Sequence, residues 1–196
     1  ETSVLQMPEA RPFPNWEAMP NVPEGDVIEH DFSSEKMGFT GRRLWVYTPP
    51  EYDRNRPELY PLLLLFDGQW MVGPLQVPHI ANALIKHDRM EPVVIAMLES
   101  GSQSQRINDY ISSSDTFDAV MTELLPLMQN DYHIDANNLG IGGVGEGAIA
   151  AAYAALQNPE AFSHLIMLSP PLGRGKAQER LLEYADRFKE ADNVPD

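Results

Sequence analysis

The chain has 196 residues, 43% of them hydrophobic, which favours a single globular domain. Its 29 acidic residues outnumber 14 basic ones, and the formal net charge of -15 argues against nucleic acid or anionic membrane surfaces as partners and favours neutral or cationic small molecules. The absence of cysteine excludes disulfides, thiolate metal ligands and a cysteine nucleophile.

The first 25 residues are expected to form an extended lead-in or linker, because they carry five prolines and little hydrophobic periodicity. The folded domain is expected over residues 26–196. The chain opens with Glu1 and shows no basic segment leading into an apolar one, so any leader is expected to have been removed. The sequence does not indicate whether the protein is cytoplasmic or exported.

Strand and helix patterns alternate along the rest of the chain. Partial alternation over 27–32 and 42–47 predicts an antiparallel pair, and short apolar runs predict strands buried on both faces at 61–66, 92–98, 138–142 and 165–168. Helices are expected over 77–86, 117–130, 148–157 and 176–190. This order predicts an α/β fold with a mostly parallel sheet and helices on both faces. No apolar run reaches the roughly 18 residues of a membrane span.

A glycine-rich segment joins a predicted strand to an alanine-rich helix. Gly140, Gly142 and Gly145 match the dinucleotide-binding pattern G-x-G-x-x-G. That pattern belongs to the first strand–helix unit and needs an acidic residue about 20 residues on, at the end of the next strand. Four strands precede this segment, and the next strand runs into Ser169 and two prolines, so the sequence argues against a nucleotide cofactor.

The same segment also matches the nucleophile elbow G-x-S-x-G of α/β hydrolases. In this alignment Gly143 and Gly147 flank the sharp turn, and Gly145 stands where the nucleophilic serine belongs. A glycine-rich turn packed closely against its helix explains these five residues equally well. The surrounding sequence has to decide between the two interpretations.

Other segments of the chain are similar to one known family. The chain resembles the putative esterase family of α/β hydrolases, which includes enterochelin (ferric siderophore) esterases and esterase D-like enzymes, over residues 22–171. The Asp-Gly-Gln-Trp stretch at 67–70 is especially similar to the siderophore-esterase branch. The segments that carry the resemblance are Arg43–Tyr52, Tyr60–Trp70, Arg106 with Asp109-Tyr110, Glu123–Pro126, Ala154–Phe162 and Leu168–Pro170.

The resemblance implies ester hydrolysis by serine, histidine and an acid, with backbone N–H groups of Gly68, Gln69 and Glu146 forming the oxyanion hole. Gly145 has no hydroxyl, so the chain is expected to be inactive as written. The triad's acid and histidine would follow the elbow, yet the one histidine there, His164, falls at a packing position of the family. The last strands of the fold are therefore expected to be missing.

Three residues are candidates for substrate binding, each with a structural alternative. Asp67 lies at the carboxyl end of a predicted central strand, where open α/β sheets bind ligands, or it caps a turn. Trp70 forms the wall of an acyl or aromatic pocket, or it belongs to the core. Arg106 orients a substrate, or it forms an ion pair with Asp109. The scattered histidines predict no metal site.

Two functions are favoured, and a third is ranked below them. The chain is an esterase-like domain, of siderophore or acyl ester type, whose nucleophile was replaced; or it is a natural non-catalytic hydrolase fold that binds a small ligand or a protein partner. Glu146 and Ala148 also depart from the family's usual residues, which favours inherited loss. A pure interaction module ranks last. A further segment or a homo-oligomer is expected to cover the sheet edge.

Overall fold

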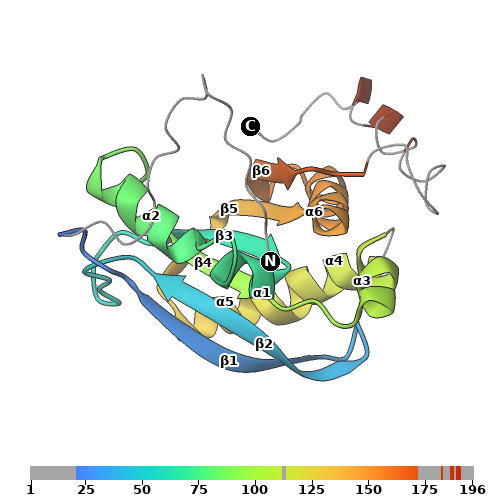
Figure 1. The fold of residues 1–196 in the computed structure, drawn as a ribbon, viewed down its shortest axis with the longest axis horizontal. Coiled ribbons are helices and arrows are strands. Elements are labelled where there is room, and N and C mark those ends of the chain that lie inside the picture. Colours follow the sequence, from blue (N-terminus) through green and yellow to red (C-terminus); the bar gives the residue numbers. More distant parts are fainter. Residues whose placement is uncertain (1–20, 112–113, 172–181, 183–185, 188, 191–196) are drawn as a thin grey trace.

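A six-stranded mixed sheet organises the computed structural model, which describes residues 21–111, 114–171, 182, 186–187 and 189–190 (Figure 1). The strand order is β1-β2-β4-β3-β5-β6, with antiparallel pairing from β1 to β4 and parallel pairing from β4 to β6. The predicted α/β class with a mostly parallel sheet is confirmed. The strands are β1 (Asp26–Ser34), β2 (Phe39–Thr48), β3 (Tyr60–Phe66), β4 (Val94–Leu98), β5 (Ile134–Val144) and β6 (Phe162–Leu168).

Helices cover both faces of the sheet, as expected. One face packs α1 and α2 against a cluster that includes Leu65 and Met97, and the other packs α3, α5 and α6 against a cluster that includes Leu62 and Leu64. Alternate residues of β3 therefore enter different cores, which explains its continuous apolar run. The helices are α1 (Gly68–Val72), α2 (Val77–Lys86), α3 (Gln103–Tyr110), α4 (Ser114–Ala119), the π-helical turn η1 (Val120–Leu124), α5 (Leu125–Asp131) and α6 (Glu146–Gln157).

The helix expected over 117–130 is divided into three parts by Pro126. Proline has no N–H to donate, and its ring collides with the carbonyl four residues earlier, so a regular helix cannot run through it. Just before the proline, the Leu125 N–H bonds to the carbonyl of Val120, five residues back, which is the π-helical pattern. The turn also carries Glu123, whose carboxylate accepts hydrogen bonds from Ser34 Oγ (2.5 Å) and the Glu35 N–H (3.1 Å) and so ties down the β1–β2 hairpin.

Other boundaries differ modestly from expectation. The helix over 77–86 is confirmed at its predicted limits. Strand β5 is longer than expected, over 134–144, and its added first residue, Ile134, pairs with Tyr60 of β3. The short helices α1 and α3 were not predicted. Most of the expected lead-in and of the terminal helix over 176–190 lies outside the described residues. Within the described part, no helix is long and apolar enough to cross a membrane.

The topology gathers chemistry-bearing residues at one edge of the sheet. Strands β3, β4 and β5 run parallel, so their carboxyl ends meet there. Asp67 follows β3, Ser100 lies two residues beyond β4, and Gly145 follows β5. Open α/β sheets place ligand sites at this edge.

Candidate functional site

A sharp turn connects β5 to α6 at Gly145. This residue has φ 56° and ψ -121°, a left-handed φ that favours glycine. Its N–H donates to the Leu168 carbonyl of β6 (2.9 Å), and its own carbonyl accepts from the Ala148 N–H (3.1 Å). The turn therefore has the strand–turn–helix form that the nucleophile-elbow interpretation requires.

The glycines on either side of the turn are required by close packing. A Cβ on Gly143 would lie 2.4 Å from the carbonyl carbon of Gly147, and a Cβ on Gly147 would lie 2.5 Å from Asp67 Oδ2. At Gly145 the nearest heavy atom to a built Cβ is Arg106 Nη2, at an ordinary contact distance of 3.5 Å. The centre of the turn thus has room for a side chain, and this chain provides no hydroxyl there.

The nucleotide-binding interpretation does not fit this geometry. Gly140 and Gly142 lie inside β5, opposite His164 and Ile166 of β6, and not in a phosphate-binding loop. A Cβ on Gly142 would meet Ile166 Cβ at 2.8 Å, so this glycine provides space for a neighbouring strand. The structure therefore argues against a dinucleotide site, as the sequence does.

An ion-pair cluster lies directly beside the turn. The Arg106 guanidinium donates to both carboxylate oxygens of Asp67, from Nε at 2.7 Å and from Nη2 at 2.8 Å. Nη2 also donates to the Val144 carbonyl at 2.9 Å, and Nη1 pairs with the carboxylate of Glu146. One arginine thus links the end of β3, the end of β5 and the start of α6.

The prediction that Arg106 forms an ion pair with Asp109 was wrong. Asp109 pairs with Arg42 Nη1 at 2.8 Å, whereas Arg106 turns inward to Asp67. The hydrogen bonds that Arg106 donates to Asp67 raise the pKa of Arg106 although burial opposes them, so the guanidinium stays charged. Asp67 is fully buried in a left-handed conformation (φ 63°, ψ 45°), so both it and Arg106 lie beneath the surface that a ligand would touch.

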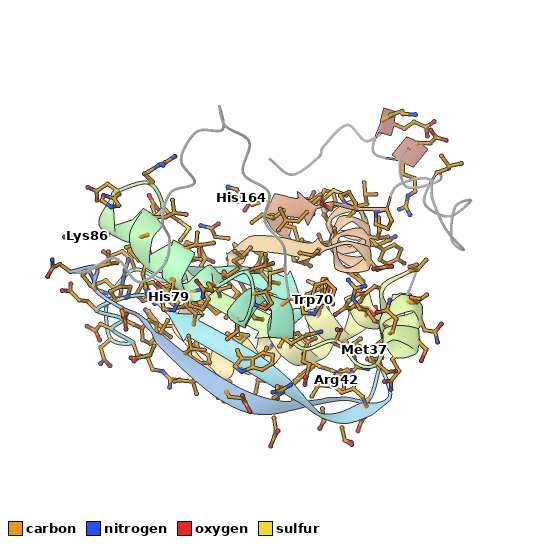
Figure 2. The ribbon with its side chains drawn as sticks, in the orientation of Figure 1. Met37, Arg42, Trp70, His79, Lys86 and His164 are labelled. Carbon is orange, nitrogen blue, oxygen red and sulfur yellow. The ribbon has the colours of Figure 1, made fainter. Side chains whose placement is uncertain are left out.

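The loop after β3 presents Gln69 and Trp70. The Gln69 side chain donates to Ser100 Oγ (2.6 Å) and accepts from the Ser100 N–H (3.1 Å), which ties this loop to the end of β4. Trp70, labelled in Figure 2, is 41% exposed. The Arg106 Cζ atom lies 5.1 Å from its ring centroid. Of the three predicted binding residues, Trp70 is the one that solvent reaches substantially.

The backbone donors predicted for an oxyanion hole lie at two helix starts. Gly68 and Gln69 open α1, and Glu146 opens α6. The first N–H groups of a helix have no acceptor four residues earlier, so they are available for a ligand. Gly68 is confined by the Met97 carbonyl, 2.4 Å from where its Cβ would be, which holds this loop close to β4. Their assignment as an oxyanion hole stays a prediction.

None of the five histidines is placed as a catalytic base for the turn. His164 pairs with Gly140 in the β6 ladder and lies four residues before Leu168, roughly 13 Å along the strand, and Figure 2 draws it well apart from Trp70. In the described residues, no group of three or more His, Asp or Glu side chains is arranged to hold a metal ion. His30 bonds to the Tyr132 hydroxyl (2.6 Å), His133 to the Arg56 carbonyl (2.8 Å) and His164 to Ser163 Oγ (2.9 Å), while His79 lies in α2 and His87 follows it.

Comparisons with known proteins agree on one family. A family model described as "Putative esterase" matches residues 34–194. The chain is 28% identical over 185 residues to the iron(III) enterobactin esterase of Escherichia coli K12, which covers 92% of this chain and 45% of that protein. The chain therefore spans about half the length of the curated relatives it matches.

Solved structures give the same result. The enterobactin esterase of Shigella flexneri, crystallised in the presence of enterobactin, is 27% identical with a TM-score of 0.79 over 95% of this chain and 48% of that one. The same enzyme in the presence of 2,3-dihydroxy-N-benzoyl-serine gives a TM-score of 0.78 at the same identity and coverage. A ferulic acid esterase from Anaeromyces mucronatus is 14% identical over 98% of this chain and 88% of that one, with a TM-score of 0.73, and shares the fold.

Proposed function

The chain belongs to the putative esterase family, and we propose that it binds a small carboxylic ester without hydrolysing it. The observation that carries the proposal is the turn at Gly145, which has the backbone form of a nucleophile elbow and no side chain. Acyl transfer in this family of folds requires a hydroxyl oxygen at this point to attack the carbonyl carbon. Without it, backbone donors and the pocket surface remain, but no covalent intermediate forms.

The proposed ligand is an ester of the siderophore or acyl class. The homologous Shigella flexneri enzyme was crystallised in the presence of enterobactin and of 2,3-dihydroxy-N-benzoyl-serine, which supports an ester of a serine whose nitrogen carries a hydroxylated benzoyl group. In this chain, the backbone N–H groups of Gln69 and Glu146 would hold the carbonyl oxygen. The exposed face of Trp70 would pack against the aromatic acyl group.

The nucleophile was lost either in a natural non-catalytic protein or by replacement of a single residue in an active one. The contacts around the turn support the natural non-catalytic protein. Glu146, which follows the glycine, pairs with Arg106, and Arg106 in turn contacts Val144 on the other side of the turn. The glycine at the nucleophile position is thus followed by a charged residue, Glu146, that belongs to the ion-pair cluster around Arg106. Such an arrangement is expected when the flanks have changed together with loss of the nucleophile.

Ester binding and turnover by the full chain test the proposal. The purified chain is titrated with the methyl ester of 2,3-dihydroxy-N-benzoyl-serine by calorimetry, and acid release is followed by liquid chromatography. We expect saturable binding with no release beyond the buffer control. Trp70→Ala should weaken binding about tenfold through loss of aromatic contact. Leu59→Ala, at a similarly exposed apolar residue just before β3, should not change it. Acid release in proportion to protein concentration, or no binding, would contradict the proposal.

A further inference from the structure

The ion-pair cluster at the elbow contains more negative than positive charge. Two carboxylates, those of Asp67 and Glu146, share the single guanidinium of Arg106, so the cluster has a formal charge of -1. The side chains differ greatly in accessibility: 0% of Asp67, 5% of Arg106 and 26% of Glu146 are exposed. The charge that solvent or a ligand meets at this point is therefore the carboxylate of Glu146.

Arg106 cannot offset that carboxylate for an incoming ligand. Its Nε and Nη2 are committed to the buried Asp67 in a two-point ion pair, and Nη2 also donates to the Val144 carbonyl. Only Nη1 reaches Glu146. Because Asp67 already balances the arginine at close range, the field above the turn is that of the second, outer carboxylate.

Within the part of the chain that the structure describes, the arginines of β2 do not supply the missing positive charge. On β2, Arg42 pairs with Asp109 at 2.8 Å and Arg43 pairs with Glu99 at 2.5 Å. The whole chain carries a formal net charge of -15, so the background potential has the same sign as the elbow.

The position of Glu146 brings this charge to the ligand. It is the residue directly after Gly145, and its backbone N–H is one of the donors proposed for the ester carbonyl. Trp70, whose ring centroid lies 5.1 Å from the Cζ atom of Arg106, offers an exposed aromatic surface, which attracts cations and accepts neutral rings. A carboxylate and an indole around one donor pair favour an uncharged or cationic ligand and oppose an anionic one.

We infer that Glu146 is a specificity-determining residue that selects uncharged or cationic esters over anionic ligands at this elbow. The inference rests on the proposed function and narrows its ligand. An uncharged ester would bind, whereas the corresponding free carboxylate would bind more weakly.

A matched pair of ligands tests the inference. The methyl ester of 2,3-dihydroxy-N-benzoyl-serine and the corresponding free acid differ in one negative charge and are titrated separately into the full chain. We expect the ester to bind about tenfold more tightly than the acid, a ratio that corresponds to about 1.4 kcal/mol and to one partly screened charge pair. The ratio should fall as salt is raised, because ions screen the partly exposed carboxylate.

Two variants distinguish the effect of the Glu146 carboxylate on ligand choice from the effect of the chain's net charge. Glu146→Gln removes the carboxylate but keeps an oxygen that accepts from Arg106, so the ratio of ester affinity to acid affinity should fall from about tenfold to about one. Glu58→Gln removes the same charge from another arginine-paired glutamate, which lies before β3 and therefore roughly 20 Å away at the opposite edge of the sheet. This control should keep the wild-type preference. Thermal unfolding of all three proteins verifies that each is folded.

Two results would overturn the inference in distinguishable ways. Ester and acid binding equally well to the wild type, or Glu146→Gln leaving their ratio unchanged, would show that a pocket exists and that Glu146 does not select its ligand. Failure of both compounds to bind any of the three folded proteins would instead remove the proposed ester site, and the inference with it.

Discussion

Alanine substitution at the glycines of the elbow is expected to give costs that differ by position. At Gly145 a Cβ meets no atom closer than 3.5 Å, so Gly145→Ala incurs only the strain of a left-handed φ, about 1–2 kcal/mol. At Gly143 the Cβ would lie 2.4 Å from backbone of α6, which no side-chain rotation relieves. Gly143→Ala must move the helix away from the sheet, at a cost of about 3 kcal/mol or more.

Urea unfolding followed by far-ultraviolet circular dichroism measures these costs. At an unchanged slope of the unfolding free energy against urea, Gly143→Ala should therefore lower the urea midpoint further below that of the wild type than Gly145→Ala does. Gly41→Ala is the matched control, because Gly41 has φ +66° and nothing within 4 Å of its Cβ position. It should resemble Gly145→Ala. A Gly143→Ala protein as stable as Gly145→Ala would refute the close approach of α6 to β5 that defines the elbow.

Three further outcomes follow from the site. Arg106→Met should destabilise the protein by about 3–5 kcal/mol in urea unfolding, because it leaves the buried Asp67 carboxylate without a partner, whereas Arg43→Met at an exposed pair should cost about 1 kcal/mol or less. Burial raises the pKa of Tyr132 to about 12, so stability present below about pH 10 should be lost as pH rises toward 12, and Tyr132→Phe should show a smaller loss of urea midpoint over that range. Gly145→Ser should hydrolyse 4-nitrophenyl acetate no faster than Gly145→Ala, because no histidine lies beside the turn to take the serine proton; a serine-dependent burst of nitrophenol would contradict this.

The main elements of the fold follow from local sequence patterns. The apolar run at 61–66 corresponds to β3, and the helix over 77–86 has its expected limits, because burial on one or both faces leaves a periodic signal. Helix α1 has only five residues, and α3 is too polar, to show such a signal. A capping box formed by Ser102 and Gln105 marks the start of α3 and is the signal from which that helix was predictable.

The elbow was predictable and the ion-pair cluster beside it was not. The spacing of Gly143, Gly145 and Gly147 is a local pattern, and the backbone at Gly145 has the form that the spacing predicts. Arg106 and Asp67 are 39 residues apart, so their pairing depends on how β3 and α3 meet in the folded chain. The nearer Asp109 was the natural partner to expect from sequence, and it is drawn instead to Arg42 on β2.

The most direct test of the central claim is covalent labelling with a fluorophosphonate probe, which reacts with activated serine nucleophiles. The full chain is incubated with the probe, and its intact mass is measured beside that of an active serine esterase. We expect an unchanged mass for this chain, because Gly145 provides no hydroxyl at the elbow. A single stoichiometric adduct, mapped to any serine of the chain, would contradict it.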